Sequence, residues 1–112
     1  MDVTTVHFDS TKVKNAYSKE RADFKTQINI SNIIYLFFGQ DKCYYIGETD
    51  ASLSQRCYDN TPRHIDANWF NNCDKVILIK LDNELGDIER RAIEATFILS
   101  YKSAGHPLAN KK

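Results

Sequence analysis

Residues 33–47 read IIYLFFGQDKCYYIG, and this stretch decides the expected fold. A continuous apolar and aromatic run, Ile33–Phe38, is followed by the polar segment Gly39–Lys42 and by a second β-prone run, Cys43–Ile46. Two β-prone runs separated by a short turn that contains Gly and Asp predict a β-hairpin. We therefore expect two adjacent antiparallel strands at the centre of the domain.

Strand alternation assigns faces to the two central tyrosines. Because successive side chains of a strand point to opposite faces, Tyr35 is expected on the face of Ile33 and Phe37. By the same rule Tyr45 is expected on the face of Cys43. The two tyrosines can then point to the same side, if the register of the hairpin allows it.

The rest of the chain predicts one further strand and two helices beyond the hairpin. A helix is predicted over Ala51–Tyr58, with Thr49 or Asp50 as its N-cap. The unbroken apolar centre of Lys75–Leu81 predicts a strand buried on both faces. The final helix is predicted over Asp87–Ser103, because apolar residues recur there at helical spacing.

The apolar spacing of the final helix also predicts which of its faces packs inward. Arg90 and Arg91 are expected at the surface, as most arginines are. The residues expected on the inward face are Ile88, Ala92, Ala95, Thr96 and Leu99.

The order β-β-α-β-α predicts an α/β domain of the α+β sandwich type, with a small, mainly antiparallel three-stranded sheet flanked by helices. Residues 32–112 form this domain in our interpretation. Residues 1–31 are expected to be an N-terminal extension, in which residues 1–13 form an irregular arm or a short strand and Asn15–Gln27 contains a short helix.

Composition limits the classes of function. The chain has 112 residues, of which 42% are hydrophobic and 27% charged, as in one soluble globular domain. Its formal net charge is +0. Proteins that grip long duplexes tightly usually carry a basic excess, so the neutral charge counts against such a protein but does not exclude an enzyme that uses a local basic cleft.

Cysteine usage and the apolar runs bear on location. The cysteines at positions 43, 57 and 73 are odd in number and show no Cys-x-x-Cys spacing, which predicts reduced thiols in a cytoplasmic protein. Residues 1–10 lack the apolar core of a signal peptide. The apolar runs are too short to span a bilayer, so no membrane partner is expected.

Several polar residues follow one another in an order that is more informative than any one of them. A tyrosine ends an Ile-Ile-Tyr triplet, Tyr-Ile-Gly follows about ten residues later, and further polar residues lie on both predicted helices and near the C-terminus. The set is Tyr35, Tyr45, Gly47, Thr49, Arg56, Glu94 and Asn110. In this order and spacing, residues 32–110 resemble the GIY-YIG nuclease family.

The resemblance implies a divalent-metal-dependent endonuclease that hydrolyses phosphodiester bonds of nucleic acid, which we expect to be DNA. It implies catalytic roles for Tyr35, Tyr45, Arg56 and Asn110. It also implies that Glu94 binds Mg²⁺ or Mn²⁺, cations that prefer hard carboxylate oxygens. The guanidinium of Arg56 matches phosphate geometry, and Tyr35 could act as a base only with a lowered pKa.

Substrate contacts are expected at Gly47, Thr49 and His64. The chain departs from the family pattern at two positions: Ile33 replaces the first glycine, and Asn60 replaces a histidine that many relatives carry one helical turn after the arginine. The nearest histidine is His64, beyond Pro62. Which side chain assists proton transfer therefore stays open.

Other interpretations of the same residues stay open as well. Strand tyrosines usually serve packing, and the pair Trp69 and Phe70 could either close the core or stack an unpaired base. The chain could be a catalytically inactive module of this fold that binds nucleic acid or protein. It could also be the nuclease part of a larger protein with added specificity domains, or act as a homo-oligomer.

Overall fold

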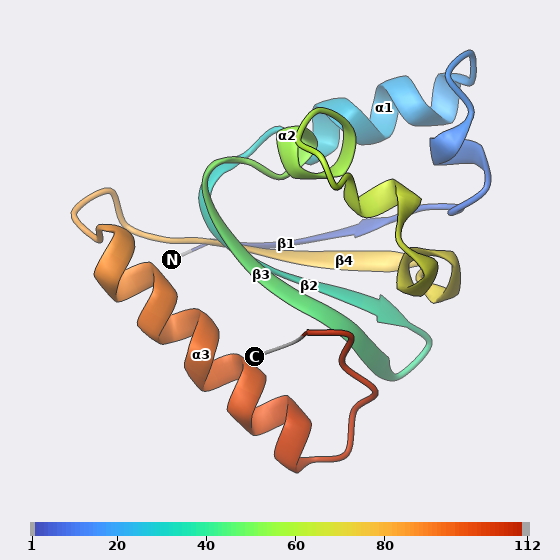
Figure 1. Cartoon of the computed structure of the whole chain (residues 1–112). Helices are drawn as coiled ribbons and strands as arrows, with labels where there is room; N and C mark the ends of the chain where they lie inside the picture. The colour runs from blue at the N-terminus through green and yellow to red at the C-terminus, as the bar shows by residue number, and fades with distance from the viewer. Residues whose placement is uncertain (1, 111–112) are drawn as a thin grey trace.

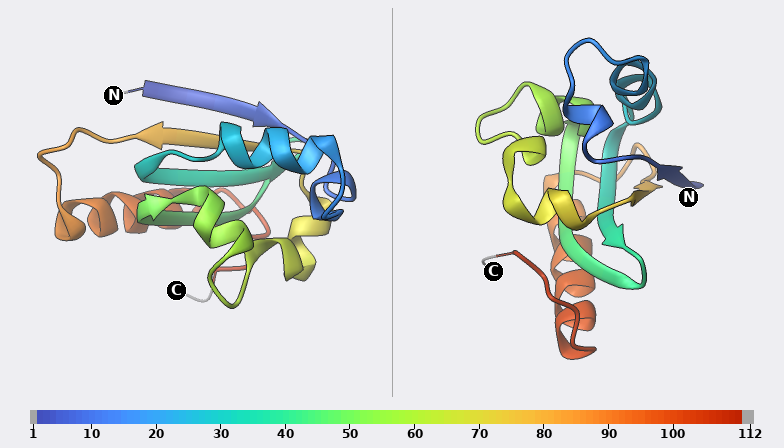
Figure 2. Two further views of the ribbon diagram at one scale, coloured as in Figure 1. Left: turned by 90° about the horizontal axis from the view of Figure 1, so that it is seen from above. Right: turned by 90° about the vertical axis from the view of Figure 1, so that its right-hand side faces the viewer.

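A four-stranded antiparallel sheet separates two layers of helices in the computed structural model, which describes residues 2–110 (Figures 1 and 2). The strands lie in the order β1, β4, β2, β3, and every neighbouring pair is antiparallel. Their bounds are Asp2–His7 for β1, Ser31–Gly39 for β2, Lys42–Ser52 for β3 and Lys75–Lys80 for β4. The predicted α+β class and the central hairpin are confirmed.

The expected three-stranded sheet is wrong, because β1 adds a fourth strand. It pairs with β4 in a continuous register from Asp2 opposite Lys80 to His7 opposite Lys75. Along β1 only Val6 is buried, since this strand lies at the edge of the sheet. A strand with a single buried side chain carries almost no alternating pattern, which explains why the sequence left this segment open between an irregular arm and a short strand.

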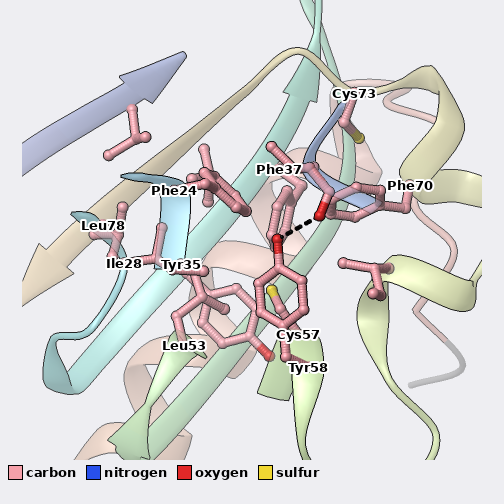
Figure 3. Close-up of a cluster of buried hydrophobic side chains, with 14 of the residues drawn as sticks. Phe24, Ile28, Tyr35, Phe37, Leu53, Cys57, Tyr58, Phe70, Cys73 and Leu78 are labelled. Atoms are coloured by element: carbon pink, nitrogen blue, oxygen red, sulfur yellow. Dashed lines mark hydrogen bonds between the residues drawn. The ribbon is translucent and has the colours of Figure 1, made fainter. Parts of the chain in front are cut away.

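One face of the sheet is covered by α1 (Lys19–Gln27), α2 (Leu53–Tyr58) and two short 3-10 helices, His64–Asp66 and Asn68–Asn72. Aromatic and aliphatic side chains from the sheet and these helices form one buried cluster (Figure 3). The N-terminal segment contributes to the same cluster. The buried members are Val6, Val13, Phe24, Ile28, Ile33, Tyr35, Phe37, Leu53, Cys57, Tyr58, Ile65, Phe70, Cys73, Val76 and Leu78.

The other face is covered by α3 (Asp87–Ser103), which packs mainly on β3 and β2. The bounds of α3 agree with the sequence, but its predicted inward face is wrong: Ile88 is 81% exposed and Leu99 is 67% exposed. The buried residues of α3 are Arg90, Glu94 and Ile98. Two inward positions are charged, and the apolar residues that pack inward with Ile98 are Ile93, Phe97 and Tyr101, a helical stripe other than the predicted one.

The start of α2 also differs from the prediction. Strand β3 continues through Ser52, and it is Ser52, not Thr49 or Asp50, that caps α2 by accepting a hydrogen bond from the backbone N–H of Gln55 at 3.2 Å. A longer β3 carries Thr49 and Asp50 along the sheet edge and not at a helix end.

Across residues 2–110 no helix combines the length and the apolar character needed to cross a bilayer.

Candidate active site

Most of the residues singled out by the sequence line one pocket at the edge of β3. The pocket has a volume of about 340 Å³, and β2, β3, α2 and α3 all contribute to its wall. The lining residues are Tyr35, Tyr45, Gly47, Glu48, Thr49, Asp50, Arg56 and Glu94. The two remaining predicted residues, His64 and Asn110, line a neighbouring cavity of about 390 Å³ that shares Tyr45 and Arg56 with the first.

A β-bulge brings the two tyrosines to the same face. Phe37 pairs with Tyr45 and Phe38 pairs with Cys43, so Tyr44 is an extra residue in β3. The expectation that Cys43 and Tyr45 share a face is therefore wrong. The bulge places Cys43 in the cluster beneath α3 and Tyr45 against the cluster beneath α1 and α2, next to Tyr35. The Tyr35 and Tyr45 rings stack with centroids 6.3 Å apart.

Gly47 makes room for the phenol ring of Tyr35. The two residues lie opposite each other in the hairpin. A Cβ atom at position 47 would lie 2.3 Å from both Cζ and the hydroxyl oxygen of Tyr35. Only glycine fits this position while the ring keeps its place.

Tyr35 and His64 form the central polar contact of the buried face. The hydroxyl of Tyr35 and Nε2 of His64 share a hydrogen bond of 2.7 Å, and both residues are buried. The sequence assigned His64 to substrate contact and gave no sign of this pairing, since the two residues are 29 positions apart.

Burial shifts the pKa values of Tyr35 and His64 in the directions that favour the uncharged form of each side chain. It lowers the pKa of His64 to about 4, with a smaller contribution from the positive charge of Arg56. Burial, together with the neighbouring Tyr45, raises the pKa of Tyr35 well above its usual range, and Arg56 offsets this only in part. A base role required a lowered pKa for Tyr35, and the shift found is in the opposite direction. Both side chains are therefore neutral at pH 7.

Arg56 lies half-buried on α2, between the two cavities. Leu53 and Cys57 are fully buried and anchor this short helix to the sheet. The pKa of Arg56 is raised: burial, the largest single effect, acts to lower it, but Tyr35, Tyr45 and Glu48 more than compensate. Arg56 thus brings a permanent positive charge to the pocket.

The α3 side contributes charged groups. Glu94 is buried, with 5% of its surface exposed, and lines the pocket. Arg90, expected at the surface, is only 4% exposed, whereas Arg91 is exposed as predicted. The inward direction of Arg90 and Glu94 results from their spacing of one helical turn.

Arg90 holds a carboxylate in the pocket wall. Its Nε lies 3.4 Å from Oε2 of Glu48, and its other nitrogens donate to Asn32 Oδ1 at 3.1 Å and to Asp87. Glu48 also lies 3.8 Å from Arg91. Sequence reasoning missed Glu48 and Asp50 as pocket residues, although both directly follow the Tyr-Ile-Gly triplet.

The donor chemistry of the pocket fits a divalent cation. Glu94, Glu48 and Asp50 bring carboxylates to one wall. Within residues 2–110 no cluster of three or more His, Cys, Asp or Glu side chains forms a complete metal site. A cation here would therefore depend on one carboxylate, with Glu94 as the candidate, and on waters and a phosphate, which is a usual mode for Mg²⁺.

Asn110 ties the C-terminal segment to the edge of β3. Its Oδ1 accepts a hydrogen bond from the backbone N–H of Ile46 at 3.0 Å, and its Nδ2 donates to the Ile46 carbonyl at 2.6 Å. The backbone N–H of Ala109 donates to the Tyr44 carbonyl at 2.8 Å. The amide of Asn110 thus fixes the strand between Tyr45 and Gly47.

Comparison of the chain with protein-family models, with curated proteins and with solved structures gave no match in any of the three cases. The geometry of the pocket is therefore the basis for assigning a function.

Proposed function

We propose that this protein is a divalent-metal-dependent endonuclease of GIY-YIG type that hydrolyses phosphodiester bonds in DNA. The supporting observation is the meeting of Tyr35, Tyr45, Arg56 and Glu94, from four different elements, in one pocket. Separate packing roles would not require two phenols, a guanidinium and a buried carboxylate to converge.

Arg56 and Tyr45 are the groups that would hold the scissile phosphate. Both are half-buried, so each keeps a face toward the pocket. The guanidinium can donate two parallel hydrogen bonds to phosphate oxygens, and the phenol of Tyr45 can donate a third. These donors are already in place before substrate arrives, which is the condition for efficient stabilisation of a charged transition state.

Tyr35 and His64 would accept the proton of the attacking water. In this scheme the oxygen of Tyr35 takes the proton from water while its own proton moves to Nε2 of His64. The distance of 2.7 Å and the unprotonated state of the imidazole fit this transfer, whereas a pKa of about 4 makes His64 a weak proton acceptor. The scheme does not need a free phenolate, and it gives His64 the role that the sequence left unassigned.

Glu94 would bind the divalent cation, which would supply positive charge to the non-bridging phosphate oxygens. Arg90 keeps Glu48 in place beside it. We also propose a cytoplasmic location, supported by the three buried free thiols, Cys43, Cys57 and Cys73.

The proposal is tested by incubating supercoiled plasmid DNA with the purified protein in Mg²⁺, Mn²⁺ or EDTA. We expect nicking with either cation, none in EDTA and none with Glu94→Gln, which keeps the shape of the buried side chain. Glu84→Gln, at an exposed position in the turn before α3, is the matched control and should nick like the parent. Cleavage that persists in EDTA or in Glu94→Gln would contradict the proposal.

One observation favours a second candidate, a non-catalytic binding module of the same fold. Tyr35 is fully buried in the apolar cluster, as a tyrosine used for packing would be (Figure 3). Tyr35→Phe separates the two candidates, because it keeps the ring and removes the hydroxyl. Loss of cleavage with unchanged DNA binding supports the nuclease, whereas DNA binding without any cleavage by the parent supports the binding module.

A further inference from the structure

The cavity next to the candidate active site differs from it in chemistry. It has a volume of about 390 Å³, within the range of roughly 300–1,000 Å³ that is typical of small-molecule pockets. Apart from the shared Tyr45 and Arg56, its wall comes from the segment between α2 and β4 and from the C-terminal segment. The remaining lining residues are Pro62, Arg63, His64, Ala67, Trp69, Ala109 and Asn110.

Two stacked aromatic rings form part of this wall, so one face of Trp69 is already covered by Tyr45. The rings of Trp69 and Tyr45 stack with centroids 4.6 Å apart and planes 7° apart. Trp69 is only half-buried, whereas its neighbour Phe70 is fully buried in the core. The sequence left open whether Trp69 and Phe70 close the core or stack an unpaired base. In the structure Phe70 closes the core, and Trp69 lines a cavity.

The surroundings of Trp69 combine apolar contact with positive charge. Pro62, Ala67 and Ala109 supply small apolar surfaces, and Arg56 and Arg63 supply guanidinium groups. Arg63 pairs with Asp66 at 2.8 Å, so Arg56 is the cation that both cavities use. Aromatic rings beside a cation are the combination on which unpaired bases stack in single-stranded DNA.

We propose that this second cavity receives one unpaired nucleobase, next to the phosphate held at Arg56, so that the preferred substrate is single-stranded DNA. The inference rests on the proposed function. A base inside a duplex cannot enter such a cavity unless it leaves the stack. The formal net charge of +0 agrees with this preference, because binding through a single stacked base depends less on phosphate neutralisation than duplex binding does.

The chain has a single tryptophan, so its fluorescence reports on this cavity directly. The Glu94→Gln protein in EDTA is titrated with a single-stranded tetranucleotide, with the same sugar-phosphate backbone without bases, and with a short blunt duplex. We expect the tetranucleotide to quench the fluorescence of Trp69 and the duplex not to quench it. The affinity for the base-free backbone should be lower than that for the tetranucleotide by roughly 5- to 100-fold, as loss of a stacked base implies. Equal affinity for the tetranucleotide and the base-free backbone would overturn the inference.

A second variant keeps the test independent of the fluorophore. Ala109→Leu narrows the cavity from the exposed C-terminal segment and leaves Trp69 and Arg56 in place. We expect it to weaken tetranucleotide binding about fivefold or more without affecting the base-free backbone. An unchanged affinity would count against the inference. If cleavage fails but binding depends on a base, the nuclease proposal falls alone; if cleavage occurs without base dependence, only this inference falls.

Discussion

The two faces of the sheet bury different kinds of polar group where they meet at the edge of β3. Beneath α1 and α2 the buried polar groups are neutral: the Tyr35–His64 pair and the Tyr58 hydroxyl, which donates to the Val13 carbonyl at 2.8 Å. Beneath α3 they are charged: Arg90 and Glu94. The pocket lies where these two environments meet.

This difference suggests a division of work. An apolar surrounding keeps Tyr35 and His64 uncharged, and uncharged groups can pass a proton at pH 7. On the other face, Arg90 holds the carboxylate of Glu48 in a fixed position. The neutral pair belongs to one face and the buried Glu94 to the other, so the edge strand that the faces share is where Tyr35 and Glu94 line one pocket and His64 lines its neighbour.

The largest effect is expected for Arg56, the cation that the α1/α2 face brings to the pocket. Arg56→Ala should reduce the nicking rate by two to three orders of magnitude, or on the order of 3 kcal/mol, as loss of a preorganised donor does. Lys102→Ala removes an exposed cation of α3 and should leave the rate unchanged. Circular dichroism of both variants separates lost chemistry from lost fold, and a parental rate for Arg56→Ala would remove Arg56 from the site.

The charged face is tested by Arg90→Met. This change leaves Glu48 and Asn32 without their buried partner and should lower the free energy of unfolding by about 3 kcal/mol, the low end for a broken buried pair, because Asp87 is exposed. Arg91→Met at the exposed neighbour should change it by less than about 0.5 kcal/mol. Equal effects in urea unfolding would show that α3 has no distinct charged inward face.

The neutral face is tested by the pH dependence of stability. The pKa of His64 is about 4 in the folded protein and 6.5 for an unperturbed histidine. The unfolded chain binds a proton at His64 more readily than the folded protein does. The contribution of neutral His64 to the free energy of unfolding is therefore fully present above pH 6.5. It is lost as the pH falls toward 4, by about 3 kcal/mol over the whole window. His64→Gln should flatten the urea-unfolding profile in this window, and an unchanged slope would show that His64 is not kept neutral by burial.

A smaller loss of stability is expected at Gly47. Gly47→Ala places a methyl group against the Tyr35 ring and should cost about 2 kcal/mol, as overpacking of a core does. At Gly86 the nearest atom to an added Cβ is the flexible Glu89 Oε1, 3.3 Å away, so Gly86→Ala should be tolerated. Thermal unfolding of the two variants makes the comparison, and a stable Gly47→Ala protein would mean that the tyrosine ring is free to move.

The smallest effect is expected where the neutral face is purely structural. Tyr58→Phe removes one buried hydrogen bond and should cost about 1 kcal/mol with no change in nicking rate. Tyr17→Phe, at an exposed position, is the matched control for stability. A loss of cleavage in Tyr58→Phe would extend the site beyond the residues that line the pocket.

The sequence predicted what depends on local pattern. The hairpin, the strand at Lys75–Lys80 and the bounds of α3 follow from apolar runs and turn residues, and the candidate site residues were chosen because their order and spacing resemble the GIY-YIG family. The edge strand β1 was left open as an irregular arm or a short strand, because a strand with one buried residue has no alternation. The inward face of α3 was misassigned because the helix carries a second apolar stripe, Ile93, Phe97, Ile98 and Tyr101, and this stripe packs on the sheet.

Other features depend on contacts between distant residues, which a single sequence does not reveal. The bulge at Tyr44 reverses the face of Cys43, and alternation alone cannot locate a bulge. The Tyr35–His64 bond joins β2 to the 3-10 helix His64–Asp66, and Arg90 of α3 contacts Glu48 of β3, 42 positions away in the sequence. Whether a buried polar group on an inward face is charged or neutral depends on the residues opposite it in the fold, and these are distant in the sequence.

The central claim is that groups from the two faces act together on one phosphate. It is tested most directly by the plasmid-nicking rates of Arg56→Lys, Glu94→Asp and the double variant in Mg²⁺. If both residues serve one site, the double variant should be slower by clearly less than the product of the two single factors. Factors that multiply fully, or single variants that nick like the parent, would contradict the account.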